Sequence, residues 1–154
     1  MASRGTTHVP SVYILLRKGN TIAFLLRHNT DYMNGKYCVP TGHVEYLEEY
    51  TTAALRETQE EAGVTIDPAN LRYIHTAARL HEGKDHVRLD IYFEATEWEG
   101  EAYNAEPQKH AELVWFEVDN LPYDKLIPSH AGVLKQIFAG KYFSKHGWSN
   151  SSGT

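Results

Sequence analysis

The hydrophobic pattern of this chain begins as strand-like and then becomes helical. Two apolar runs rich in β-branched residues, Val9–Leu16 and Thr21–Arg27, flank the turn-forming Lys18-Gly19-Asn20 and predict a β-hairpin. From about Leu47 to Ala62 good helix formers dominate, and Gly63 follows where a C-terminal cap belongs. We therefore expect a helix to follow the opening strands.

Further along, the pattern predicts more strands and one more helix. In Pro128–Gly140 the apolar Val133, Leu134, Ile137 and Phe138 recur at helical spacing, and the proline suits a first helical turn. Extended segments are expected at Lys36–Val39, Gly42–Glu45, Leu71–Leu80, His86–Thr96 and Leu113–Val118. Because about six or seven strands do not alternate regularly with the helices, the order favours a mixed sheet flanked by helices over a doubly wound parallel sheet.

The composition is that of an ordinary globular protein. The chain has 154 residues, of which 42% are hydrophobic and 23% are charged. A chain of this length buries about 70% of its unfolded surface, so we expect residues 1–154 to form one domain with a flexible tail from about residue 149. The formal net charge of -5 argues against a DNA or RNA partner, because a binder of the nucleic-acid backbone needs a basic face.

Targeting and redox features favour the cytoplasm. The N-terminus is polar and lacks the apolar core of a signal peptide, and no run approaches the roughly 18 apolar residues of a membrane span. We therefore expect a cytoplasmic protein that does not bind membranes. Cys38 is the single cysteine, which excludes an internal disulfide and a cysteine-rich zinc site. We expect Cys38 to be a small buried strand residue.

The first predicted helix carries a high concentration of glutamates. Each residue advances an α-helix by about 100°, so Glu57, Glu60 and Glu61 fall within a sector of roughly 100°. Arg56 is the only basic residue between positions 45 and 64, and the helix dipole disfavours anions in the last turns. A bound cation would offset both penalties. Carboxylate oxygens suit Mg²⁺ or Mn²⁺, and magnesium is commonly completed by substrate phosphates.

An isolated Glu-x-x-Glu-Glu is more often a solvated helix face, so the neighbouring positions matter. The stripe expected to pack inward is Thr51, Leu55, Thr58 and Ala62. Tyr50, Ala53 and Ala54 are expected on the same side as the acids. A magnesium ion held by these acids and by substrate phosphates favours chemistry on a phosphate anhydride.

The spacing of this segment resembles a known signature. The segment carries Gly42, Glu48, Arg56-Glu57, Glu60-Glu61 and Gly63-Val64, separated by five, seven, two and one residues. This pattern resembles the 23-residue box of the Nudix (MutT-like) hydrolases. Every polar and glycine position of that box, residues 42–64, is filled. The one departure is Thr58, where an aliphatic residue is usual, and threonine is close to valine in shape.

This resemblance implies an α/β/α sandwich with a mixed central sheet and Mg²⁺- or Mn²⁺-dependent hydrolysis of a nucleoside diphosphate linked to a moiety X. Arg56 would orient the glutamates, and Glu48 would complete the box. The implied metal ligands are Glu57, Glu60, Glu61, the Thr41 carbonyl and Glu112. The general base would be Glu60 or Glu61, followed by Glu112, since a base must reach the attacking water.

The resemblance leaves the substrate open. We place a nucleoside triphosphate pyrophosphohydrolase first, and a nucleoside diphosphate-sugar or dinucleoside polyphosphate hydrolase second, acting as a monomer or homodimer. The candidate substrate-binding residues are Arg27, Tyr37, His43, Ser129 and His130. Family members that cleave oxidised purine triphosphates carry an acidic pair where this chain has Ser129-His130, which argues against 8-oxo-dGTP.

Three other functions fit the sequence less well. A Nudix-fold module that senses a nucleotide without cleaving it should have degenerate acids, and here they are intact. His81-Glu82 and His86 resemble a zinc protease only superficially, because HExxxH is one residue too long for one helix face. Isomerisation of an isoprenoid diphosphate needs a reactive cysteine, for which Cys38 gives poor support. The remaining histidines, including His110, are expected at the surface or in caps.

Overall fold

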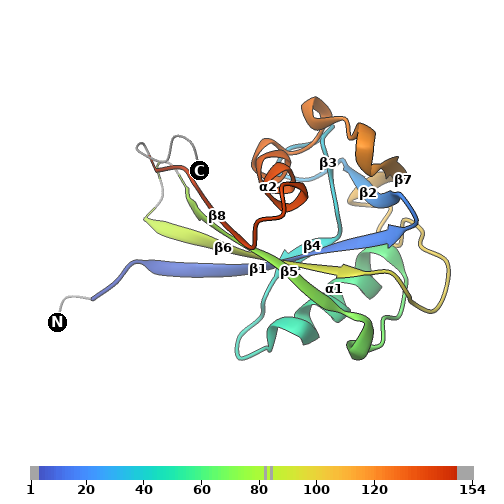
Figure 1. Cartoon of the computed structure of the whole chain (residues 1–154), viewed down its shortest axis with the longest axis horizontal. Helices are drawn as coiled ribbons and strands as arrows, with labels where there is room; N and C mark the ends of the chain where they lie inside the picture. The colour runs from blue at the N-terminus through green and yellow to red at the C-terminus, as the bar shows by residue number, and fades with distance from the viewer. Residues whose placement is uncertain (1–3, 82, 84, 149–154) are drawn as a thin grey trace.

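The computed structural model describes residues 4–81, 83 and 85–148, so the tail predicted from residue 149 lies outside the described residues. Figure 1 shows a sheet with a helix on either side. The strands are β1 (Thr7–Lys18), β2 (Thr21–Arg27), β3 (Tyr37–Cys38), β4 (Thr41–His43), β5 (Arg72–Leu80), β6 (His86–Ala95), β7 (His110–Glu117) and β8 (Phe143–His146). The helices are α1 (Tyr50–Ala62) and α2 (Pro128–Phe138), and short 3-10 turns lie at Pro68–Asn70, Val118–Asn120 and Tyr123–Lys125.

The long strand β1 joins the parts of the sheet. It pairs in parallel with β6 from Thr7 to Leu16, and antiparallel with β4 and, next to the turn, with β2. The strand order is β3-β2-β1-β6-β5-β8, while β4 pairs with β1 and β7 pairs with β2. Since α1 and α2 cover opposite faces (Figure 1), the predicted mixed sheet between helices is confirmed.

Two apolar clusters fill the space on either side of the sheet. Side chains alternate along β1, so Tyr13 and Leu15 belong to the cluster under α2, whereas Val12 and Ile14 belong to the cluster under α1. Each fully buried side chain of this size contributes roughly 1.5–3 kcal/mol. No helix among the described residues is long and apolar enough to span a membrane.

Helix α1 begins at Tyr50 rather than at about Leu47. Leu47 has a φ of 58°, which lies outside the helical region. Glu49 is the N-cap, and its carboxylate accepts hydrogen bonds from two amides of the first turn. The predicted start was wrong because the good helix formers before Tyr50 form a loop, which leaves Glu48 available for the site. The predicted end is confirmed, because Gly63 adopts a left-handed φ of 68°.

The buried face of α1 also differs from the prediction. Its buried residues are Ala53, Ala54, Thr58, Glu61 and Ala62, while Thr51 and Leu55 are only half-buried. The two alanines expected on the acidic side therefore pack against the sheet. Their small side chains allow the helix to lie close to the sheet. Glu61 is buried on the same side of the helix.

Outside α1 the hairpin and α2 agree with the predictions, and two strands differ. Strand β7 begins at His110 rather than at Leu113. His110 is 3% exposed, so the expected surface position for this histidine was wrong. Strand β8 was not predicted; it pairs in parallel with β5, and its inward-facing Ser144 hydroxyl is hydrogen-bonded to the buried His75 at 2.8 Å.

Candidate active site

Arg56 connects the glutamates of α1 to the loop before the helix. Its Nε and Nη2 donate to the two carboxylate oxygens of Glu48 at 2.8 and 2.9 Å, and its Nη1 donates to Glu57 at 2.8 Å. Nη2 also donates to the His43 carbonyl at 3.1 Å, and Nη1 lies 3.4 Å from Glu60. A planar guanidinium is suited to such forked contacts. Arg56 thus holds these acids in fixed positions relative to β4.

Gly42 makes room for the carboxylate of Glu57. A β-carbon on Gly42 would lie 2.0 Å from both Cδ and Oε1 of Glu57, so the carboxylate rests directly on the glycine backbone. The Glu57 side chain is 12% exposed. Burial raises its pKa, although the Arg56 guanidinium partly counteracts this effect.

Glu60 and Glu61 lie in opposite environments although they are adjacent on the helix. Glu61 is 8% exposed, and one of its oxygens accepts a hydrogen bond from the Thr41 amide at 3.0 Å. Burial raises the pKa of Glu61 well above its ordinary value, the Thr41 contact partly offsets this, and the charge of Glu57 adds to it. The Glu60 side chain is 51% exposed. Of these two neighbouring acids, Glu60 therefore has open access to water.

The chemistry of these donors fits a hard divalent cation. Among the residues that the structure describes, no three His, Cys, Asp or Glu side chains are already grouped so that they could hold a metal ion. Glu57 turns toward Arg56 instead, and Glu61 toward the Thr41 amide. Both carboxylates are desolvated, and a nearby cation favours the charged form of such a group. Oxygen donors of this kind match Mg²⁺ or Mn²⁺.

Two acids outside the box take different positions. Glu112 on β7 is exposed, and its Oε1 accepts a hydrogen bond from the Tyr37 hydroxyl at 2.7 Å. Glu106 precedes β7 and pairs with Lys109 at 3.2 Å, and its charge adds to the raised pKa values of the two buried box acids. The structure thus brings Glu106 beside the box. Nothing in the sequence marks Glu106, because a single glutamate in a segment without a periodic pattern carries no signal.

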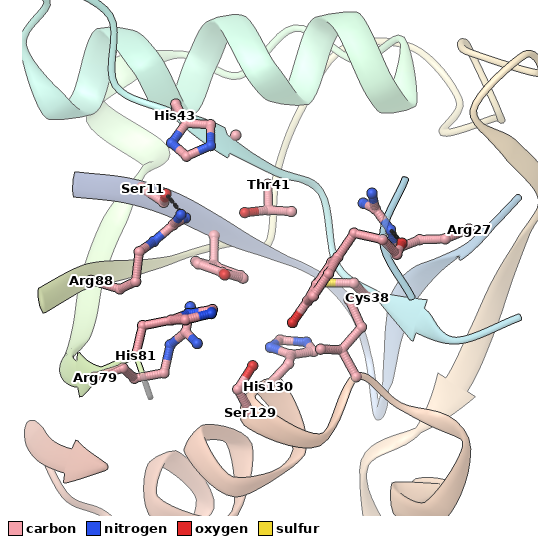
Figure 2. Close-up of a pocket in the computed structure, with 14 residues that line it drawn as sticks. Ser11, Arg27, Cys38, Thr41, His43, Arg79, His81, Arg88, Ser129 and His130 are labelled. Atoms are coloured by element: carbon pink, nitrogen blue, oxygen red, sulfur yellow. Dashed lines mark hydrogen bonds between the residues drawn. The ribbon is translucent and has the colours of Figure 1, made fainter. Parts of the chain in front are cut away.

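A pocket of about 400 Å³ lies between β4 and the first turn of α2 (Figure 2). Strand β4 contributes Gly42 and His43, and the first turn of α2 contributes Ser129 and His130. Gly42 supports Glu57 with its backbone and also lines the pocket. A ligand in the pocket would therefore lie next to the glutamates.

The candidate substrate-binding residues are mostly gathered here. Arg27, His43, Ser129 and His130 line the pocket, whereas Tyr37 does not belong to its lining. Their roles stay predictions.

Cys38 also lines the pocket, at 3% exposure, and burial raises the pKa of its thiol. The buried strand position predicted for it is confirmed. A thiol in this state is a poor nucleophile, which further weakens the isomerase alternative.

The comparison with protein families agrees with this geometry. A model of the NUDIX domain matches residues 7–137. The chain therefore belongs to the Nudix family, and the resemblance found in its box is confirmed.

Individual relatives are more distant. The chain is 30% identical over 128 residues to the NAD-capped RNA hydrolase NudC of Stutzerimonas stutzeri (strain A1501). The matched stretch covers 83% of this chain and 42% of that relative. It thus spans less than half the length of this curated relative.

Solved structures show the same fold. The MutT NUDIX hydrolase of Burkholderia pseudomallei superimposes with a TM-score of 0.75 at 22% identity, covering 84% of this chain and 98% of that one. The MutT protein of Methanosarcina mazei Go1 gives a TM-score of 0.72 at 20% identity, covering 89% and 97%.

The Arg56–Glu48 pair predicts a specific response to acid. Hydrogen bonding to Arg56 lowers the pKa of Glu48 from 4.5 to about 2. A depressed folded-state pKa adds stability that is present above the unfolded pKa and is lost as pH falls through the folded one. We expect Glu48→Gln to be less stable than wild type at pH 7, with a difference that shrinks between about pH 4.5 and pH 2.

Urea unfolding across this pH range measures the effect. Glu45→Gln is the matched control, because Glu45 lies 3.6 Å from Arg56 with its side chain 67% exposed, and exposed pairs contribute little. A difference between Glu48→Gln and wild type that stayed constant with pH would contradict the assignment.

Proposed function

We propose that this protein hydrolyses a phosphoanhydride bond in a nucleoside diphosphate derivative, with Mg²⁺ or Mn²⁺ held by the glutamates of its Nudix box. The observation that carries the proposal is the pair of desolvated carboxylates, Glu57 and Glu61, on one helix beside a ligand-sized pocket. Burying carboxylates is costly unless a cation or strong hydrogen bonds compensate them. A bound divalent ion would compensate the charge of these carboxylates and would explain why they are buried.

The side chains of the box have different proposed roles. Arg56 positions Glu48 and Glu57 through the contacts described above. The proposed metal ligands are Glu57, Glu60, Glu61 and the Thr41 carbonyl, with Glu106 or Glu112 from outside the box. A divalent ion, when bound, neutralises charge on the diphosphate and lowers the pKa of a bound water. The general base is Glu60 or Glu61, and the exposure of Glu60 supports its access to water.

A nucleoside triphosphate is our first candidate substrate, followed by a nucleoside diphosphate-sugar or a dinucleoside polyphosphate. The relative named as an NAD-capped RNA hydrolase supports including NAD-type dinucleotides among the candidates. The expectation that no RNA polymer is bound stays a prediction, as do the cytoplasmic location and the oligomeric state.

Hydrolysis of a substrate panel tests the proposal. The panel contains nucleoside triphosphates, UDP-glucose, diadenosine tetraphosphate and NADH, and phosphate or nucleotide release is measured with Mg²⁺, Mn²⁺ or EDTA. We expect metal-dependent release from at least one compound. Glu60→Gln should lower kcat by about 10²- to 10⁴-fold, the range of a lost general base.

Glu117→Gln, the same change at the exposed end of β7, is the matched control and should retain activity. If wild type and Glu60→Gln are equally inert on every compound, the hydrolase proposal fails and the non-catalytic sensing module replaces it.

A further inference from the structure

Two arginines stand opposite each other at the wall of the pocket. Arg79 on β5 and Arg88 on β6 are register partners, and Figure 2 shows both on the same side of the pocket. Like charges directly opposite on neighbouring strands destabilise a sheet. Asp90 offsets part of this cost, because it is 1% exposed and its carboxylate accepts a hydrogen bond from Arg79 Nε. We call this site, formed by Arg27, Arg79, Arg88 and His130, the arginine pocket.

The positive charge of the arginine pocket is only partly compensated. Arg88 donates to the neutral Ser11 hydroxyl at 2.7 Å, and its Nε is buried without a hydrogen-bond partner among the described residues. Arg27 lies across the pocket (Figure 2) and donates to the Tyr32 carbonyl and the Thr30 hydroxyl. Neither Arg27 nor Arg88 forms an ion pair with a described carboxylate, and the described lining contains no Asp or Glu.

A buried imidazole beside the arginines provides a second sign of a ligand. His130 is 2% exposed, and burial together with Arg79 lowers its pKa to about 3. Its Nδ1 is hydrogen-bonded to the Tyr92 hydroxyl at 2.8 Å, which leaves Nε2 buried without a partner among the described residues. Buried polar groups normally have partners. Asp90 Oδ1 also lacks one among the described residues. A guanidinium nitrogen can only donate, so the unpaired Arg88 Nε indicates a missing acceptor beside the pocket.

We propose that the arginine pocket receives a phosphate monoester carried on a sugar of the substrate, separate from the diphosphate that is cleaved. Guanidinium groups bind phosphate oxygens with forked geometry. An uncharged base would satisfy single hydrogen bonds but would leave the surplus positive charge uncompensated. The volume of about 400 Å³ lies near the lower end for ligand pockets and suits a sugar phosphate. The inference rests on the proposed function, because Gly42 places the pocket beside the glutamates.

Binding in the absence of metal tests this inference without requiring hydrolysis. Calorimetry in EDTA removes metal-mediated phosphate binding at the box. The probes are two matched pairs, adenosine 2′-monophosphate with adenosine and ribose 5-phosphate with ribose, and each pair differs by one phosphate monoester. We expect at least one phosphorylated probe to bind about tenfold or more tightly than its partner, with a preference that weakens as salt rises. The pair that shows this preference distinguishes a nucleoside phosphate from a free sugar phosphate as the ligand.

Substitution of Arg88 locates the binding. Arg88→Gln should reduce affinity for the phosphorylated probe by about ten- to a hundredfold, as expected for a lost charged hydrogen bond. Arg72→Gln is the matched control, because Arg72 is an exposed β5 residue outside the pocket lining. It should retain the preference. Arg88→Lys keeps the charge without the fork and should give an intermediate affinity, which preserves the test if the glutamine variant does not fold.

Two results would overturn the inference. They are equal binding of the phosphorylated and plain probes, and a preference that survives in Arg88→Gln. Failure of the proposed function looks different. In that case no phosphoanhydride is cleaved with Mg²⁺, whereas phosphate binding in EDTA is retained.

Discussion

Glu61→Gln is expected to be more stable than the wild type at neutral pH without metal, and to lose nearly all activity. Glu61 is 8% exposed, and its carboxylate accepts a hydrogen bond from the Thr41 amide at 3.0 Å. Glutamine keeps an acceptor oxygen for that amide and removes the buried charge. We expect a gain of about 0.5–2 kcal/mol in the free energy of unfolding, the range typical of single stabilising substitutions. The kcat should fall at least about 100-fold.

The pH dependence of this effect has a definite sign. Burial raises the pKa of Glu61, so the folded state retains this proton to a higher pH than the unfolded state does. The stability due to the raised pKa is fully present below the unfolded pKa of 4.5 and is lost as pH rises through the folded pKa. The advantage of Glu61→Gln should therefore be small near pH 4 and grow toward pH 8, as measured by urea unfolding in EDTA.

Magnesium should reverse the order of stability. A ligand that binds only the folded state stabilises it, so Mg²⁺ should raise the unfolding free energy of the wild type more than that of Glu61→Gln. Glu60→Gln is the matched control, because this neighbouring side chain is 51% exposed and its substitution should leave stability in EDTA unchanged. Equal stability of wild type and Glu61→Gln at pH 8 in EDTA would show that the buried charge carries no cost.

The contrast between Glu60 and Glu61 shows which properties of the site the sequence predicts and which it does not. Helical periodicity predicts that the two acids share a sector, because that depends only on the step of about 100° per residue. Their burial depends on what covers the helix, and here residues 103–105 fold over its end. The amides of Tyr103 and Ala105 donate to the carbonyls of Ala62 and Glu61. These hydrogen bonds join parts of the chain that are distant in sequence, so no local sequence pattern predicts them.

The same reasoning explains the other differences. Strand β8 is short, and its inward Ser144 is stabilised by His75 from β5, so only the folded sheet reveals it. The buried His130 depends in the same way on the Tyr92 hydroxyl. Elements defined by their own residues, such as the opening hairpin and the Gly63 cap, were predictable. Polar residues that are buried with a distant partner were not.

Gly42→Ala is expected to lower kcat/KM by about 100-fold while leaving the fold intact. The new β-carbon would lie 2.0 Å from Cδ and Oε1 of Glu57, so this carboxylate must swing away and lose its 2.8 Å contact with Arg56. A displacement of about 1 Å in a catalytic group can cost about 10²-fold. Gly42 does not have a positive φ, so alanine fits the backbone there. Steady-state kinetics with the best substrate of the panel, together with urea unfolding, measure both effects.

Gly132→Ala separates this steric effect from the general effect of adding a methyl group. A β-carbon at Gly132 in α2 would meet only His146 at 3.9 Å, which is ordinary van der Waals contact. Alanine in a helix interior should stabilise the protein by about 0.5–1 kcal/mol and leave kcat unchanged. If Gly42→Ala keeps wild-type activity, the carboxylate position seen beside Gly42 is not the one used in catalysis. If both variants lose activity equally, the loss does not arise from Glu57.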